Sequence, residues 1–120
     1  MRMEARRVRD SLIVRLNGEL DLESAGPFRT LVQEELDGSG RIRHLILDLR
    51  GVRFVDSSGV GAILGRYREI RTRRDGQMVI LGPRPPVRRV LELAGLLRLV
   101  AVADTQQQAL ALVKEGNPAP

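Results

Sequence analysis

The segment HLILDLRGVRFVDSSGVGAILGRYREI, residues 44–70, joins an apolar run to a helical pattern. Its first six residues are nearly all apolar, which is typical of a strand covered on both faces. Further along, apolar side chains recur three and four positions apart, as on the inner face of an amphipathic helix. These side chains are Val60, Ile63, Leu64, Tyr67 and Ile70. The segment therefore predicts a strand, the connection FVDSSGVG (residues 54–61), and a helix packed on a sheet.

The rest of the chain alternates between strand and helix patterns. Four more strands are predicted, at residues 3–8, 11–16, 77–81 and 97–102. Three more helices are predicted, at residues 25–36, 87–93 and 105–113, and Ser24 can cap the first of them. We expect an α/β fold with a mixed sheet of four or five strands and about four helices. We expect one domain at residues 1–115 and a flexible tail at residues 116–120.

Composition excludes several classes of function. The chain has no cysteine and one histidine, so a disulfide framework, a thiolate nucleophile and a Cys- or His-rich metal site are ruled out. His44 begins a predicted strand, where we expect it to have a structural role. No window has the apolar length of a secretory signal or a membrane span, so we expect a cytoplasmic protein without membrane contact.

The charge pattern does not favour nucleic acid as a partner. The net charge is +5, but the aromatic residues are only two Phe and one Tyr, too few for a stacking platform. The densest group of arginines falls at residues 66–74, on the predicted helix and its end. A solvated helix face explains that group, and we expect no direct contact with nucleic acid.

The serines of the connection allow two interpretations. Asp56 or Ser57 can cap the helix, and a phosphate on a hydroxyl here would be tolerated beside the positive end of the helix dipole. Gly59 and Gly61 remove side-chain bulk, so a partner can approach the hydroxyl closely. Alternatively, the serines only cap and the glycines only permit tight packing of the helix on the sheet. Spacing alone leaves both interpretations open.

An enzyme is not expected. The sequence DSSG lacks the order G-x-S-x-G of a nucleophile elbow, and the one histidine lies well before it in the chain. Nothing in the sequence brings Asp21, Asp48 or Asp56 around a common pocket for acid–base work. No Gly-Lys-Ser/Thr loop follows a strand to cradle a phosphate. We therefore predict no catalytic residues, no bound metal and no cofactor.

Three stretches carry a resemblance to a known family. GELDLESA (residues 18–25), the segment at residues 42–70 and VRRVLELAGLLRLV (residues 87–100) resemble the STAS family of bacterial anti-sigma factor antagonists. The similarity covers nearly the whole chain. The string DSSGVGAILGRYREI (residues 56–70) is similar to the sporulation members of that family, which regulate sigma factor F.

The resemblance implies a partner-switching function. Members bind an anti-sigma factor, a serine kinase with a GHKL-type ATP site that carries ATP or ADP, and so release the sigma factor. The kinase phosphorylates the serine after the motif aspartate, here Ser57, and a PP2C-type phosphatase removes the phosphate. The implied binding face consists of Asp21, Asp56, Ser57, Ser58, Gly59 and Gly61.

The resemblance also allows a second function. Other STAS modules are thought to bind a nucleotide or another small ligand as sensors. The complete DSSG motif at residues 56–59 favours the antagonist.

Overall fold

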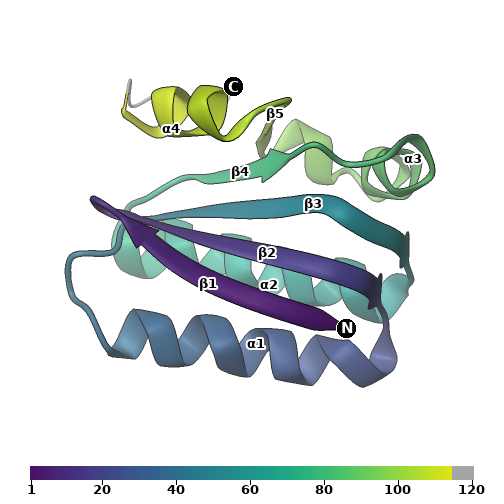
Figure 1. Cartoon of the computed structure of the whole chain (residues 1–120), viewed down its shortest axis with the longest axis horizontal. Helices are drawn as coiled ribbons and strands as arrows, with labels where there is room; N and C mark the ends of the chain where they lie inside the picture. Colours follow the sequence, from purple (N-terminus) through teal and green to yellow (C-terminus); the bar gives the residue numbers. More distant parts are fainter. Residues whose placement is uncertain (115–120) are drawn as a thin grey trace.

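The strand predicted at His44 is the centre of the sheet. In the computed structural model, which describes residues 1–114, five strands lie in the order β1-β2-β3-β4-β5 (Figure 1). They span β1 Arg2–Val8, β2 Ser11–Leu20, β3 His44–Val55, β4 Met78–Leu81 and β5 Ala101–Ala103. β1 pairs antiparallel with β2, and every other neighbouring pair is parallel. The predicted α/β fold with a mixed sheet is confirmed.

Four α-helices cover the sheet. They are α1 Leu22–Asp37, α2 Ser57–Arg74, α3 Pro85–Leu93 and α4 Gln106–Lys114, with a short 3₁₀ helix, η1, at Leu96–Arg98. α1 and α2 lie side by side on one face, and α4 lies on the other face (Figure 1). Residue 115 and the tail predicted at residues 116–120 lie outside the described residues.

Side chains along β2 and β3 point alternately to the two faces of the sheet, and a hydrophobic core forms on each face. Leu45, Leu47 and Leu49 pack with the buried side chains of α1 and α2, whereas Ile46 packs with Ala109 of α4. All six residues of HLILDL are buried, as expected for a strand covered on both faces.

The predicted inner face of α2 is also confirmed. Ile63 and Ile70 are fully buried, and Val60, Leu64 and Tyr67 are partly buried against the same core. Leu64 is therefore a shallower core position than Ile63.

Several elements differ in extent from the sequence-based prediction. β2 and β3 continue to Leu20 and Val55, because the register shifts near Asn17 and Gly18 break the alternation in sequence without ending the pairing. α1 begins at Leu22 rather than at residue 25. The strand predicted at residues 97–102 is wrong for its first four residues, because β5 begins only at Ala101. Gly95 adopts a φ of +82°, and the chain turns there into η1.

Asp48 supplies a test of the electrostatics within the sheet. Its side chain is 2% exposed, and Arg50 Nη2 and Arg15 Nε lie 2.9 and 3.3 Å from its Oδ2. Burial by itself raises the pKa of Asp48, but the hydrogen bonds and charge of Arg50, with Arg15, outweigh burial and hold that pKa below its ordinary value.

We expect Asp48→Asn to lower the free energy of unfolding by about 1–2 kcal/mol at pH 7, because a charge-assisted pair is lost. The folded-state pKa is depressed, so this stabilisation is present above the unfolded carboxyl pKa of about 3.9 and is lost as the pH falls through the folded value. Urea unfolding of both proteins at pH 7 and pH 3 checks this. A difference that stays the same at both pH values contradicts it.

Candidate functional site

The candidate site forms where β2 and β3 end side by side. Leu20 and Val55 are paired in register, and the Asp56 N–H donates a hydrogen bond to the Leu20 carbonyl at 3.2 Å. Asp21 and Asp56 therefore follow the two strand ends directly. Each of them is the N-cap of the helix that comes next, α1 or α2. Two helix N-termini thus lie next to each other at the carboxyl ends of β2 and β3, where the binding sites of α/β folds are usually found.

Asp21 is held by a capping box. Its Oδ1 accepts hydrogen bonds from the N–H groups of Glu23 and Ser24, at 3.1 and 3.2 Å. The buried Ser24 hydroxyl accepts from the Asp21 N–H at 2.9 Å and donates to the Glu19 carbonyl at 2.8 Å. Ser24, which the sequence allowed as the cap of this helix, is not the N-cap. Asp21 is the cap because its carboxylate satisfies free N–H groups of the first turn, and Ser24 reciprocates from the third helical position.

Asp56, not Ser57, caps α2. Its Oδ1 accepts from the Gly59 N–H at 2.9 Å, and Ser57 is the first helical residue. The Ser57 side chain is exposed, and among residues 1–114 neither the Ser57 nor the Ser58 hydroxyl makes a hydrogen bond with a protein group. The Ser57 hydroxyl therefore takes no part in capping. A phosphate on it would lie at the N-terminus of α2, where the helix dipole favours negative charge.

Gly59 and Gly61 have different surroundings. Gly59 is buried, and a Cβ built on it would lie 2.2 Å from the Leu20 carbonyl oxygen and 2.9 Å from Val55 Cγ1. Gly61 is exposed, and a Cβ there would meet nothing within 4 Å. Gly59 is therefore required for packing, because only glycine fits against the backbone of β2. Of these two glycines, Gly61 is the one that leaves open space on the surface.

Comparison with known proteins identifies the fold. Residues 2–109 match the family model of the STAS domain. The chain belongs to the STAS domain family. This STAS domain is 36% identical over 110 residues to the anti-sigma F factor antagonist of Paenibacillus polymyxa, covering 92% of each chain.

Solved structures agree with this assignment. A putative anti-sigma factor antagonist from Thermotoga maritima has a TM-score of 0.85 and 30% identity, with 93% of this chain and 94% of that chain covered. Bacillus SpoIIAA in its phosphorylated form has a TM-score of 0.73 and 29% identity, with 93% and 99% covered. The resemblance that the sequence carried to the STAS family is confirmed.

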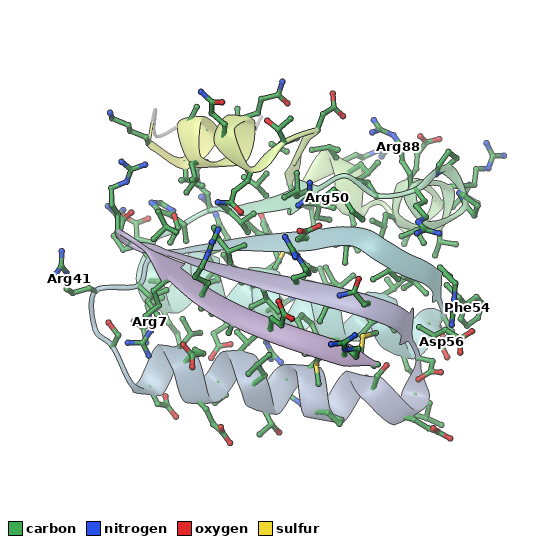
Figure 2. All side chains as sticks on the ribbon, viewed as in Figure 1. Arg7, Arg41, Arg50, Phe54, Asp56 and Arg88 are labelled. Atoms are coloured by element: carbon green, nitrogen blue, oxygen red, sulfur yellow. The ribbon has the colours of Figure 1, made fainter. Side chains whose placement is uncertain are left out.

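In this STAS domain, two large apolar side chains close in sequence to Asp21 and Asp56 are exposed. Phe54 is 50% exposed and Leu22 is 76% exposed. Figure 2 shows Phe54 beside Asp56, at the end of the molecule where β3 meets α2. We did not predict Phe54 as a site residue. The sequence did carry a signal for Phe54. Side chains of consecutive strand residues point to opposite faces, so only one of Phe54 and Val55 can face the core, and that residue is Val55.

Asp48, the third aspartate that the sequence offered for acid–base work, does not join Asp21 and Asp56 in this STAS domain. Asp48 pairs with Arg50 within β3, apart from the strand ends that Asp21 and Asp56 follow. Within residues 1–114, no group of three or more His, Cys, Asp or Glu side chains is placed to hold a metal ion. No helix in the same part of the chain has the length and apolar character needed to cross a membrane.

Proposed function

We propose that this protein is an anti-sigma factor antagonist. Its unmodified form binds an anti-sigma factor, a GHKL-type serine kinase carrying ATP or ADP, and thereby releases a sigma factor, with sigma factor F as the first candidate. The observation that carries the proposal is the exposed Ser57 hydroxyl, which Asp56 leaves free at the start of α2. The names of the similar proteins, anti-sigma F factor antagonist and phosphorylated SpoIIAA, support the partner and the modification.

The binding face surrounds Ser57. Asp21, Asp56 and Ser58 contribute polar groups, and Gly61 leaves room for the partner's backbone. Phe54 and Leu22 add apolar surface that is available for contact. Aromatic side chains are enriched at the centre of protein interfaces, whereas carboxylates are more common at the rim, so Phe54 is the expected apolar anchor of this face.

Phosphorylation switches the face off. A phosphate on Ser57 adds about −1.5 to −2 charges and three acceptor oxygens. It lies beside the Asp56 carboxylate and near the end of β2, which Asp21 follows directly. Closing the interface would therefore remove water from several negative charges that repel one another. A PP2C-type phosphatase restores the binding form by removing the phosphate.

A capture experiment tests the proposed partner. The tagged protein, incubated with a purified candidate anti-sigma kinase with and without ADP, is expected to retain the kinase, and to retain more of it with the nucleotide. The Ser57→Asp variant, with a negative charge at the modification site, is the control and is expected to retain little. Failure of the unmodified protein to retain any candidate kinase in either condition contradicts the proposal. If the protein retains no kinase but binds a nucleotide or another small ligand, the result favours the sensor function.

We expect Phe54→Ala to weaken kinase binding about 30-fold, equivalent to about 2 kcal/mol, because a half-exposed aromatic contact is lost at the interface. The free energy of unfolding is expected to change by less than about 1 kcal/mol, because half of the ring is already in solvent. Titration calorimetry and thermal melts of the same variant measure both quantities. Phe54→Leu keeps apolar contact and is expected to stay within about threefold of the wild-type affinity. Unchanged affinity in Phe54→Ala excludes Phe54 from the interface.

A further inference from the structure

The first strand of the sheet has a free edge. β1 lies at the border of the sheet (Figure 1), and within residues 1–114 only β2 pairs with it. Its seven residues, RMEARRV, pair with β2 without a register shift and include no proline. Bulges, prolines and very short strands are features that prevent pairing at an edge, and β1 has none of them. Its outer edge is therefore a regular template for another strand.

The two-residue turn after Val8 determines which backbone groups of β1 face outward. Such a turn is closed by a hydrogen bond from the Ser11 N–H to the Val8 carbonyl, so these two residues form a hydrogen-bonded pair. Hydrogen-bonded and non-hydrogen-bonded pairs alternate along the ladder, so the even-numbered residues of β1 bond to β2. The N–H and C=O groups of Met3, Ala5 and Arg7 consequently point away from the sheet.

The charges of β1 permit one register of pairing between two copies of this strand. Arg2, Glu4 and Arg6 are exposed and project to the same face of the strand. Two copies can pair antiparallel about a two-fold axis at Ala5, with every residue of the strand matched. Glu4 of each copy then lies opposite Arg6 of the other, which gives two ion pairs. A shift by two residues in either direction places Glu4 opposite Glu4 or Arg6 opposite Arg6, where like charges repel.

These charged groups are available for pairing. Within residues 1–114, the side chains of Arg2 and Glu4 make no hydrogen bond or ion pair. Arg6 Nη2 donates to the Gln106 Oε1 atom at 2.9 Å, and Gln106 is neutral, so the positive charge of Arg6 is not compensated there. A second copy of the strand would supply the missing opposite charges.

The same register satisfies the outward backbone groups. The hydrogen-bonded pairs in this register are Ala5 with Ala5 and Met3 with Arg7, which are the residues whose N–H and C=O groups point outward. On the face that carries α1, Met3 and Ala5 are only partly buried against the core. Pairing would cover Met3 further with the aliphatic part of Arg7 of the second copy. Backbone groups, charges and apolar surface are thus all matched in one register.

We propose that two copies of this chain form a dimer by antiparallel pairing of β1 with β1, which joins their sheets into one. β2 runs antiparallel to β1, so the carboxyl ends of β2 and β3 point in opposite directions in the two copies. The dimer therefore carries one binding face around Ser57 at each end. The pairing does not depend on the anti-sigma partner, because its test uses the protein alone.

Sedimentation equilibrium of the full chain over a range of concentrations tests the dimer. The wild type is expected to reach twice the mass of one chain. Glu4→Arg and Arg6→Glu each replace two ion pairs by two like-charge contacts, and each is expected to weaken the dimer about tenfold. The double variant Glu4→Arg/Arg6→Glu restores opposite charges and is expected to stay within about threefold of the wild type.

Two charge-matched controls lie on the exposed surface of α3. Glu92→Arg and Arg88→Glu change the net charge by the same amounts as the two single variants, and both are expected to stay within about twofold of the wild type. A wild type that remains monomeric at about 1 mM overturns the dimer. Equal weakening by Glu4→Arg and Glu92→Arg, or a double variant no stronger than the single variants, overturns the pairing through β1.

Ala5→Pro tests the backbone pairing separately from the charges. It removes the central outward N–H, which does not bond to β2, so the hydrogen bonds between β1 and β2 are kept. The variant is expected to stay folded in thermal melts and to sediment as a monomer. A folded Ala5→Pro variant that dimerises as well as the wild type overturns the pairing.

Amide hydrogen exchange gives a further readout on the wild type. The Ala5 N–H is expected to exchange fast in dilute protein and slowly in concentrated protein, because only the dimer satisfies it. The Arg6 N–H bonds to β2 and is expected to be protected at both concentrations. Exchange of the Ala5 N–H that does not depend on concentration overturns the pairing.

Discussion

Gly59→Ala is expected to lower the free energy of unfolding by about 3 kcal/mol, at the upper end of overpacking costs. The new Cβ would lie 2.2 Å from the Leu20 carbonyl oxygen, which cannot move aside as a flexible side chain does. That carbonyl also accepts the Asp56 N–H, so displacing it weakens the junction between β2 and the start of α2. Chemical unfolding of the variant and the wild type measures the difference.

Gly61→Ala is the matched control. It lies two residues away on the same helix, and its Cβ meets nothing within 4 Å. Because alanine is the better helix former, stability is expected to stay the same or to rise by up to about 1 kcal/mol. Equal destabilisation by the two substitutions contradicts the assignment of Gly59 to packing. Gly61→Val is expected to weaken kinase binding more than folding, because the open space at Gly61 is proposed to admit the partner.

Phosphorylation of Ser57 is expected to weaken kinase binding at least a hundredfold, equivalent to about 3 kcal/mol. The interface would have to desolvate the phosphate beside Asp56, where like charges repel and added bulk prevents close packing. Folding stability is expected to change little, because the phosphate lies at the positive end of α2 and Ser57 is exposed. Titration calorimetry and thermal melts of the two forms measure affinity and stability separately.

Serine variants locate the switch. Ser57→Ala is expected to bind the kinase and to resist phosphorylation, whereas Ser58→Ala is expected to remain a substrate. Mass spectrometry of the phosphorylated peptides identifies the modified residue. Phosphate on Ser58 instead of Ser57, or full affinity in the Ser57-phosphorylated form, contradicts the mechanism.

The fold was predictable because its signals are local. The continuous apolar run at HLILDL and the three-and-four spacing after Val60 define a buried strand and its following helix without tertiary information. The strand ends were less predictable. β2 continues past Leu16 through register shifts, and pairing with β3 rather than alternation holds those residues in the sheet.

The residues of the candidate site could be predicted from the sequence, but the structural role of each residue could not. Asp56 and Ser57 are both good N-cap residues, so the sequence leaves the choice between them open, and the backbone decides by placing Ser57 inside the helix. The helical period does distinguish the glycines. Gly59 lies four residues before the buried Ile63 and shares its face, whereas Gly61 lies about 200° further round and is exposed.

The sequence indicated a structural role for His44. The ring is buried at the start of β3, and its Nδ1 accepts a hydrogen bond from the Gln77 N–H at 3.0 Å. Only the tertiary structure shows this partner, because Gln77 lies 33 residues further along the chain.

Displacement of a sigma factor from its complex with the anti-sigma kinase tests the proposed function most directly. Labelled sigma factor F, bound to the kinase with ADP, is mixed with the unmodified protein or with the Ser57-phosphorylated protein, and its release is followed by fluorescence anisotropy. The unmodified protein is expected to release the sigma factor, and the phosphorylated protein is expected to do so only after a PP2C-type phosphatase removes the phosphate. Equal release by both forms, or release by neither, contradicts the proposed switch at Ser57.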